Sequence, residues 1–330
     1  MLCDLDGCLT PGKDKALDLA SLLVTRKALR SIQEKIRSIF GACTGRSQVY
    51  AEAMLQVLGL DKDQEESVLP YGVSVVESGA QIYKPNRFPN NNRYVELSSN
   101  LQWEQVELLN KIKLFILENG IGALEPNKDI IVSVNPSEGM SIEDFFQSVK
   151  MQLKKVGLLN EKLIGITHSK TAVDIYPQGC SKADSVAYAL SLIKQQLENE
   201  MPKNTPQILL IGVGDALNDL DWMQAGGENF IPICPGNADQ RIKEVVKEKG
   251  GYVAFNNYSD GVNEGLLLLD KVLEKILLKM RKLAKQANVS IVHPDLFIRR
   301  IKQEFSRQAC QESIRQQLNK EVLELKVRVD

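Results

Sequence analysis

Residues 207–219 read QILLIGVGDALND, and this stretch decides the fold class. After Gln207 the run is apolar as far as Val213, and Gly214 and Asp215 follow directly. A continuous apolar run of this kind is typical of a parallel strand covered by helices on both faces, because such a strand has no side open to water. A carboxylate directly after a buried strand is costly unless a metal ion or another partner faces it. The stretch therefore predicts a central strand that ends at a charged site.

Similar elements surround this strand in the sequence. Short apolar runs at 230–234 and 252–255 predict two more strands, and helical patterns at 182–199, 218–225 and 237–249 separate the runs. Strands that alternate with helices in this way favour a doubly wound sheet. The predicted fold class is therefore α/β with a doubly wound parallel sheet.

The chain has 330 residues, enough for two domains or for one large domain with an insertion. Residues 71–176 carry strand and helix patterns in an order that predicts a separate α+β insertion. The predicted core then consists of residues 1–70 and 177–265. Beyond it, an apolar stripe with steps of three and four predicts a helical extension over 266–330. The stripe is shorter than three heptads, which favours packing on the protein's own body over self-association through these helices.

Composition excludes several classes of function. The formal net charge is −1, so no overall field favours nucleic acid or an anionic membrane surface. The six cysteines form no CxxC pair and the two histidines are far apart in sequence, which disfavours a zinc site and a disulfide scaffold. No apolar run approaches the roughly 20 residues of a membrane span. We therefore expect a cytoplasmic protein without a nucleic-acid or membrane partner.

Asp4 and Asp6 lie two positions apart at the end of an expected strand, so their side chains start on the same face. Two carboxylates this close repel each other unless a cation lies between them or one binds a proton. Oxygen-rich sites of this kind suit Mg²⁺. A plain Asp-Gly turn would also explain the pair taken by itself.

Further polar groups follow other expected strands. Thr44, Gly45 and Arg46 offer a hydroxyl, a close backbone approach and a cation, which together suit a phosphate. Lys182 opens a predicted helix, where the ammonium and the helix N-terminus both favour an anion. Asp219 lies one helical turn beyond Asp215, so these two carboxylates can face one site, and Asn218 stands between them.

These four groups, in this order and at these separations, resemble the motifs of the haloacid-dehalogenase-like phosphatases. They are most similar to the branch with a large α+β cap inserted after the second motif, subfamily IIB, which holds the Cof-type and sucrose-phosphate-phosphatase-like enzymes. The resemblance covers residues 1 to about 265. It implies a Rossmann-like core and a phosphatase that acts on a small phosphorylated metabolite, with a sugar phosphate favoured.

The resemblance also implies a role for each residue. Asp4 would be the nucleophile that forms an aspartyl phosphate, and Asp6 would be the general acid. Mg²⁺ would be held by Asp4, the backbone carbonyl of Asp6, Asp215 and Asp219. The substrate would be bound by Thr44, Gly45, Arg46, Lys182 and Asn218.

Two alternatives and one irregularity accompany this hypothesis. A sugar phosphomutase of the same fold would use the same nucleophile, and a non-catalytic binding protein would have a decayed site. Every expected catalytic and metal position keeps its functional residue, which disfavours decay. Only three residues precede Asp4, where the family has about five apolar ones. Either residues of the first strand are missing before Met1, which we favour, or that strand is short and the fold is weakened.

Overall fold

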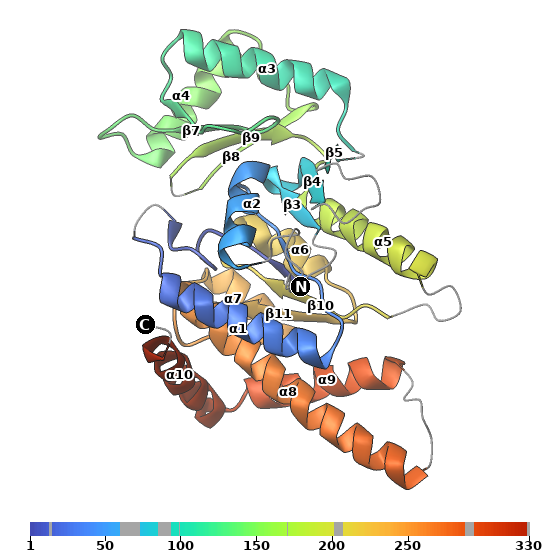
Figure 1. The fold of residues 1–330 in the computed structure, drawn as a ribbon. Coiled ribbons are helices and arrows are strands. Elements are labelled where there is room, and N and C mark those ends of the chain that lie inside the picture. Colours follow the sequence, from blue (N-terminus) through green and yellow to red (C-terminus); the bar gives the residue numbers. More distant parts are fainter. Residues whose placement is uncertain are drawn as a thin grey trace.

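The structure is a computed structural model, and its described residues form three sheets. A five-stranded sheet lies at the centre, and two antiparallel sheets of three and four strands lie to one side of it. Figure 1 shows a smaller α+β unit, which we call the cap, above a larger core, with the C-terminal helices on the opposite side of the core. The described residues are 1–12, 15–59, 73–84, 94–98, 100–169, 171–200, 207–287 and 294–328.

The central sheet is parallel throughout, with the strand order β12-β11-β10-β1-β2. Its members are β1 (Leu2–Cys3), β2 (Gly41–Ala42), β10 (Leu210–Val213), β11 (Phe230–Cys234) and β12 (Tyr252–Val253). The predicted doubly wound α/β fold is confirmed. The predicted strand at 230–234 matches β11, whereas those at 207–213 and 252–255 are longer than β10 and β12.

Helices cover both faces of this sheet, and the strands bury side chains on both sides. Along β10, Ile211 and Val213 lie in one apolar cluster while Leu210 lies in another. This alternation explains why the strand reads as a continuous apolar run, because neither face meets water. The helices around the sheet include α1 (Leu19–Lys35), α2 (Gln48–Val57), α5 (Lys182–Glu200), α6 (Leu220–Ala225) and α7 (Gln240–Glu248).

The cap contains a four-stranded antiparallel sheet with the order β6-β7-β9-β8. Its strands are β6 (Ala123–Leu124), β7 (Val132–Asn135), β8 (Ile164–His168) and β9 (Val173–Pro177). Helices α3 (Trp103–Glu118) and α4 (Ile142–Lys155) bury their apolar residues against one face, together with Val132 and Val134. Ser133, which lies between these two valines, therefore points to the other face.

The smaller sheet, β3 (Ser74–Val76), β4 (Gln81–Lys84) and β5 (Tyr94–Leu97), touches both units. The N–H of Thr44 in the core donates to the carbonyl of Val75 at 2.9 Å. Between β3 and β4, Glu77 is buried at a φ of +47°, and its carboxylate accepts hydrogen bonds from the backbone N–H groups of residues 129–131 at 2.7–2.8 Å. Glu77 therefore binds residues 129–131 of the cap to the connection between β3 and β4.

The predicted domain limits stay predictions. The limit between residues 70 and 71 lies outside the described residues, and the limit after residue 176 lies at the end of β9. The limit after residue 265 lies inside α8 (Tyr258–Ala287), which begins earlier than the predicted extension.

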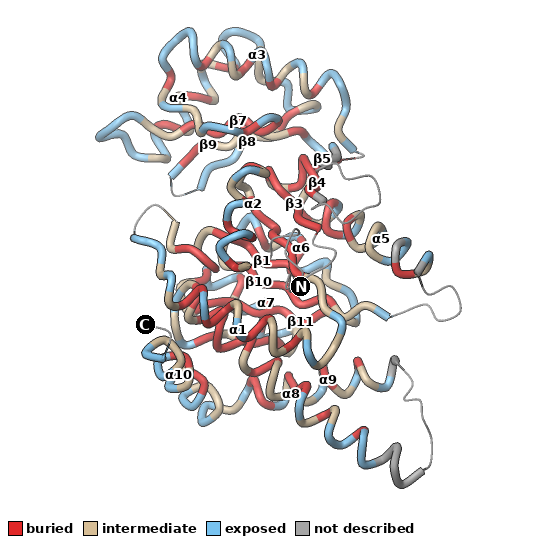
Figure 2. The backbone as a smooth tube through the Cα atoms, viewed as in Figure 1, coloured by how far each residue is buried: buried red, intermediate tan, exposed pale blue. Residues whose placement is uncertain are grey.

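The C-terminal helices α8, α9 (Pro294–Ala309) and α10 (Glu312–Val327) pack on the body of the chain. Phe305, Leu318 and Val322 are fully buried there, and α8 packs against α1. Figure 2 shows buried stretches along α1 and the central strands, and exposed stretches along α10. The apolar stripe is thus covered within the chain, as expected, and self-association stays a prediction. Among the described residues, no helix is both long and apolar enough to cross a membrane.

Candidate active site

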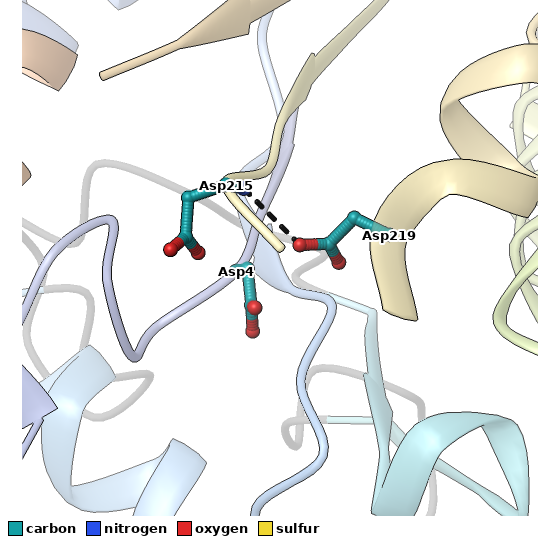
Figure 3. Close-up of side chains that lie close together, drawn as sticks. All are labelled: Asp4, Asp215 and Asp219. Atoms are coloured by element: carbon teal, nitrogen blue, oxygen red, sulfur yellow. Dashed lines mark hydrogen bonds between the residues drawn. The ribbon is translucent and has the colours of Figure 1, made fainter. Parts of the chain in front are cut away.

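Three carboxylates meet at the carboxyl edge of the central sheet. Asp4 follows β1, Asp215 follows β10, and Asp219 ends the short 3₁₀ helix η3 (Leu217–Asp219). One oxygen of each carboxylate lies within 4.8 Å of the others (Figure 3). The chain brings them together because β1 and β10 are parallel neighbours, with Cys3 opposite Val213. The sequence predicted a metal site of these three residues together with Asp6, and the metal roles stay predictions.

The electrostatics of the group favour a cation. Burial, and next the charge of Asp219, raise the pKa of Asp4 well above its ordinary value. The same two causes raise the pKa of Asp215 to about 7. A divalent cation nearby would stabilise the ionised forms of Asp4 and Asp215, which burial disfavours. The donors here are all oxygen atoms, the donor type that Mg²⁺ prefers. The residues present therefore fit a magnesium ion.

Asp219 is held from four directions. One carboxylate oxygen accepts hydrogen bonds from Lys182 Nζ at 2.6 Å and Trp222 Nε1 at 3.0 Å. The other accepts from the backbone N–H groups of Asp215 at 3.2 Å and Ala216 at 3.3 Å. Both oxygens are thus already bonded, so Asp219 orients Lys182 and the turn after β10. No pattern in the sequence indicated the contact with Trp222.

Lys182 bridges the two buried aspartates. It opens α5 and is only 2% exposed, and its Nζ lies 3.6 Å from Asp4 Oδ2. Burial by itself would lower the pKa of its ammonium, but the carboxylates of Asp219 and Asp4 raise that pKa well above its usual value. Lys182 therefore stays charged beside Asp4, as its predicted role requires.

The turn after β1 depends on Gly7. Its φ is +81°, and a Cβ there would lie 2.0 Å from an oxygen of Asp215. Only glycine fits, because any side chain would displace that carboxylate. Cys8, the next residue, is buried and donates from Sγ to Asp215 at 3.6 Å. The turn is therefore shaped around Asp215.

Asp6 is not part of this group of three carboxylates. Its side chain accepts hydrogen bonds from Thr10 Oγ1 at 3.1 Å and from Arg46 Nε. Arg46 also reaches the cap, with Nη1 3.4 Å from Glu125 Oε1. The structure pairs Arg46 with Asp6 and Glu125, and the predicted contact of Arg46 with the substrate stays a prediction. The metal role predicted for Asp6 concerns its backbone carbonyl and stays a prediction.

The other predicted substrate residues differ in their surroundings. Thr44 is buried after β2, and its Oγ1 accepts from the N–H of Arg46 at 3.1 Å. Gly45 lies beside it, where a Cβ would be 3.2 Å from Ser78 Oγ. Asn218 is exposed on η3, in contrast to the buried Asp219 that follows. The predicted substrate contacts of these residues stay predictions.

A polar cluster on the cap faces Arg46, on the side of the sheet that α3 and α4 leave uncovered. Lys128 is 8% exposed, and its Nζ lies 3.0 Å from Glu125 and 3.8 Å from Asp174. Ser133 donates to Asp174, its partner in the antiparallel register. We call Glu125, Lys128, Ser133 and Asp174 the cap cluster. Sequence reasoning missed it, because these residues are scattered along the insertion without a motif.

A family model described as sucrose-6F-phosphate phosphohydrolase matches residues 1–269. The chain belongs to this family. A solved haloacid dehalogenase-like hydrolase from Bacteroides thetaiotaomicron is 17% identical with a TM-score of 0.51, covering 80% of this chain and 97% of that chain. The sucrose-phosphatase of Synechocystis, solved with sucrose and phosphate, is 18% identical with a TM-score of 0.47, covering 81% and 95%. The comparison with curated proteins found no match.

Family membership confirms the predicted class of enzyme. The protein is a haloacid-dehalogenase-type phosphatase, as the four groups of residues indicated. The match ends within α8, so α9 and α10 lie beyond it.

Proposed function

We propose that the protein is a Mg²⁺-dependent phosphomonoester hydrolase that acts on a sugar phosphate through an aspartyl phosphate on Asp4. The observation that carries this proposal is the pairing of buried Asp4 with Lys182, 3.6 Å away, beside Asp215 and Asp219. A buried carboxylate held next to an ammonium and a cation site is arranged to meet an anionic substrate.

In the proposed reaction, an Asp4 oxygen attacks the phosphorus, and the bond from phosphorus to the leaving oxygen breaks. Asp6 gives its proton to that leaving oxygen. Water then attacks the phosphorus of the aspartyl phosphate, with Asp6 accepting the proton, which frees Asp4 and inorganic phosphate. Lys182 and Thr44 donate to the phosphoryl oxygens, where negative charge develops.

Mg²⁺ would be held by Asp4, the backbone carbonyl of Asp6 and Asp215, with Asp219 supporting. A bound Mg²⁺ would neutralise charge between the anionic nucleophile and the anionic substrate. Asp219 contributes by keeping Lys182 in place, since its Oδ1 is 2.6 Å from Lys182 Nζ.

The cap cluster supports a sugar as the leaving group. It offers two carboxylates, one ammonium and one hydroxyl on the sheet face near Arg46, which can donate to and accept from sugar hydroxyl groups. These four residues include no aromatic ring on which a nucleobase could stack. The name of the matching family points to the same class of substrate.

The test is phosphate release from a panel of sugar phosphates, phosphoglycerates and nucleotides, in Mg²⁺ and in EDTA. Asp4→Asn removes the nucleophile, and Asp221→Asn is the matched control on the exposed side of α6. Release from sugar phosphates that needs both Mg²⁺ and Asp4 supports the proposal. Isomerised sugar phosphate without free phosphate would indicate the mutase, and release that survives Asp4→Asn would refute the mechanism.

A further inference from the structure

Helix α10 lies beyond the family match, yet it is hydrogen-bonded to a loop of the core. Asn256 Nδ2, just after β12, donates to Asn319 Oδ1 on α10 at 2.5 Å. Arg315, one turn earlier on α10, lies close enough to Glu264 for its charge to lower the pKa of that carboxyl, which burial raises. One polar residue of α10 thus bonds to the loop, and a second lies near Glu264 of α8.

The loop that α10 contacts is otherwise fixed by Glu264 of α8. Glu264 is buried, and its carboxylate accepts from the N–H of Asn256 at 2.7 Å and of Phe255 at 2.9 Å. The carbonyl of Asn256 in turn accepts from the N–H of Gly236 at 2.6 Å. Asn256 therefore connects α10 with the turn that follows β11.

That turn, residues 235–239, is bonded directly to the active site. Asn237 Nδ2 donates to the carbonyl of Gly7 at 2.8 Å. The N–H of Asp239 donates to the carbonyl of Asp215 at 2.7 Å. The turn therefore holds the backbone on both sides of the carboxylate group, at Gly7 after β1 and at Asp215 after β10.

The loop also carries backbone strain where it meets the turn. Tyr258 has a φ of +51°, a conformation that a bulky side chain rarely adopts, and its N–H donates to Asn237 Oδ1 at 2.7 Å. Such a residue persists only where surrounding contacts fix it. The hydrogen bond from its N–H to Asn237 is one such contact, so the turn and the start of α8 hold each other in place.

We propose that Asn319 is a positioning residue for the active site. By holding Asn256 it fixes the turn at 235–239, and this turn sets the positions of Gly7 and Asp215 around Asp4. The effect on catalysis rests on the proposed function, but the effect on the turn does not. A purely structural role for α10 would instead reside in its buried apolar residues, Leu318 and Val322.

The experiment compares three variants of the full chain. Asn319→Ala removes the acceptor of the Asn256 hydrogen bond, Asn319→Asp keeps it, and Lys320→Ala changes an exposed neighbour whose ammonium lies 3.8 Å from Glu324 on the surface. Hydrogen exchange of peptides covering residues 5–10 and 235–239 is measured without substrate. Melting temperature, kcat and KM for phosphate release are measured alongside.

Asn319→Ala is expected to speed exchange in both peptides and to lower kcat roughly 3- to 10-fold with little change in KM, as the loss of one hydrogen bond allows. Asn319→Asp should restore both values, and Lys320→Ala should change neither. A lower melting temperature with unchanged exchange in the two peptides would overturn the proposal, as would Asn319→Asp behaving like Asn319→Ala. If the wild type releases no phosphate, the proposed function fails, while the exchange data still decide the role of Asn319.

Discussion

Replacing Asp215 with Asn is expected to stabilise the metal-free protein at neutral pH. The carboxyl is half-buried, and burial together with Asp219 raises its pKa from 3.8 to about 7. A rise of about three pH units corresponds to about 4 kcal/mol of unfavourable free energy for the ionised form. Because water reaches part of the side chain and screens its charge, we expect about half of this, roughly 2 kcal/mol.

The sign of the pH dependence follows from the direction of the shift. The folded state binds the proton of Asp215 more tightly than the unfolded chain does. Wild-type stability is therefore complete below pH 3.8 and is lost as the pH rises to about 7. Asparagine cannot ionise, so the gain from Asp215→Asn should be close to zero near pH 4 and should reach its full value by pH 8.

Urea unfolding in EDTA at several pH values measures this difference, with Asp221→Asn as the control for a general loss of negative charge. Addition of Mg²⁺ should reverse the order, since an ion at 100 times its Kd stabilises the wild type by about 2.7 kcal/mol. A variant that is less stable than the wild type at pH 8 in EDTA would refute the reasoning. An advantage of the variant that did not depend on pH would refute it equally.

Three further substitutions test the parts around this site. Gly7→Ala should lower the free energy of unfolding by at least about 2 kcal/mol and abolish phosphate release, because the residue sits at positive φ against a carboxylate; wild-type turnover would contradict this. Glu77→Gln should lower the free energy of unfolding by about 1–3 kcal/mol in urea, since the two carboxylate oxygens of Glu77 both accept N–H groups of residues 129–131 and the amide nitrogen of Gln cannot accept; an unchanged midpoint would contradict it. Trp222→Phe removes one of the donors to Asp219 and should reduce kcat about tenfold with KM nearly constant, so a change confined to KM would count against the proposed link to Lys182.

The sequence predicted the centre of the fold because the information there is local. The run at 230–234 is apolar throughout and is bounded by Asn229 and by Pro235 and Gly236, so β11 could be placed within it. Parallel strands share one carboxyl edge, so Asp4 and Asp215, which follow two different strands, had to meet. The helix that Lys182 opens was predicted at 182–199 and observed as α5.

Elements that depend on distant contacts could not be predicted in this way. Helix α8 begins at Tyr258, within a stretch rich in Gly, Asn and Asp that by itself indicates a turn. Buried Glu264 accepts two loop N–H groups and Asn263 bonds to Ser21 of α1, and these contacts offset the weak helix propensity. The pairing of Arg46 with Asp6 is equally non-local. A local motif could therefore suggest a substrate contact for Arg46 but could not indicate this ion pair.

The charges of the described site explain why a metal and an anionic substrate belong together here. When all three carboxylates are ionised, they face one ammonium, that of Lys182, which leaves two negative charges at the edge of the sheet. Arg46 does not compensate them, because it is paired with Asp6 and Glu125. A phosphate monoester would add up to two more negative charges, and like charges at this separation repel strongly in a partly buried site. A divalent cation balances the carboxylates and leaves Lys182 free to interact with the phosphoryl group. The arrangement therefore favours binding of the cation before the substrate, and predicts that the apparent KM for a sugar phosphate falls as the Mg²⁺ concentration rises.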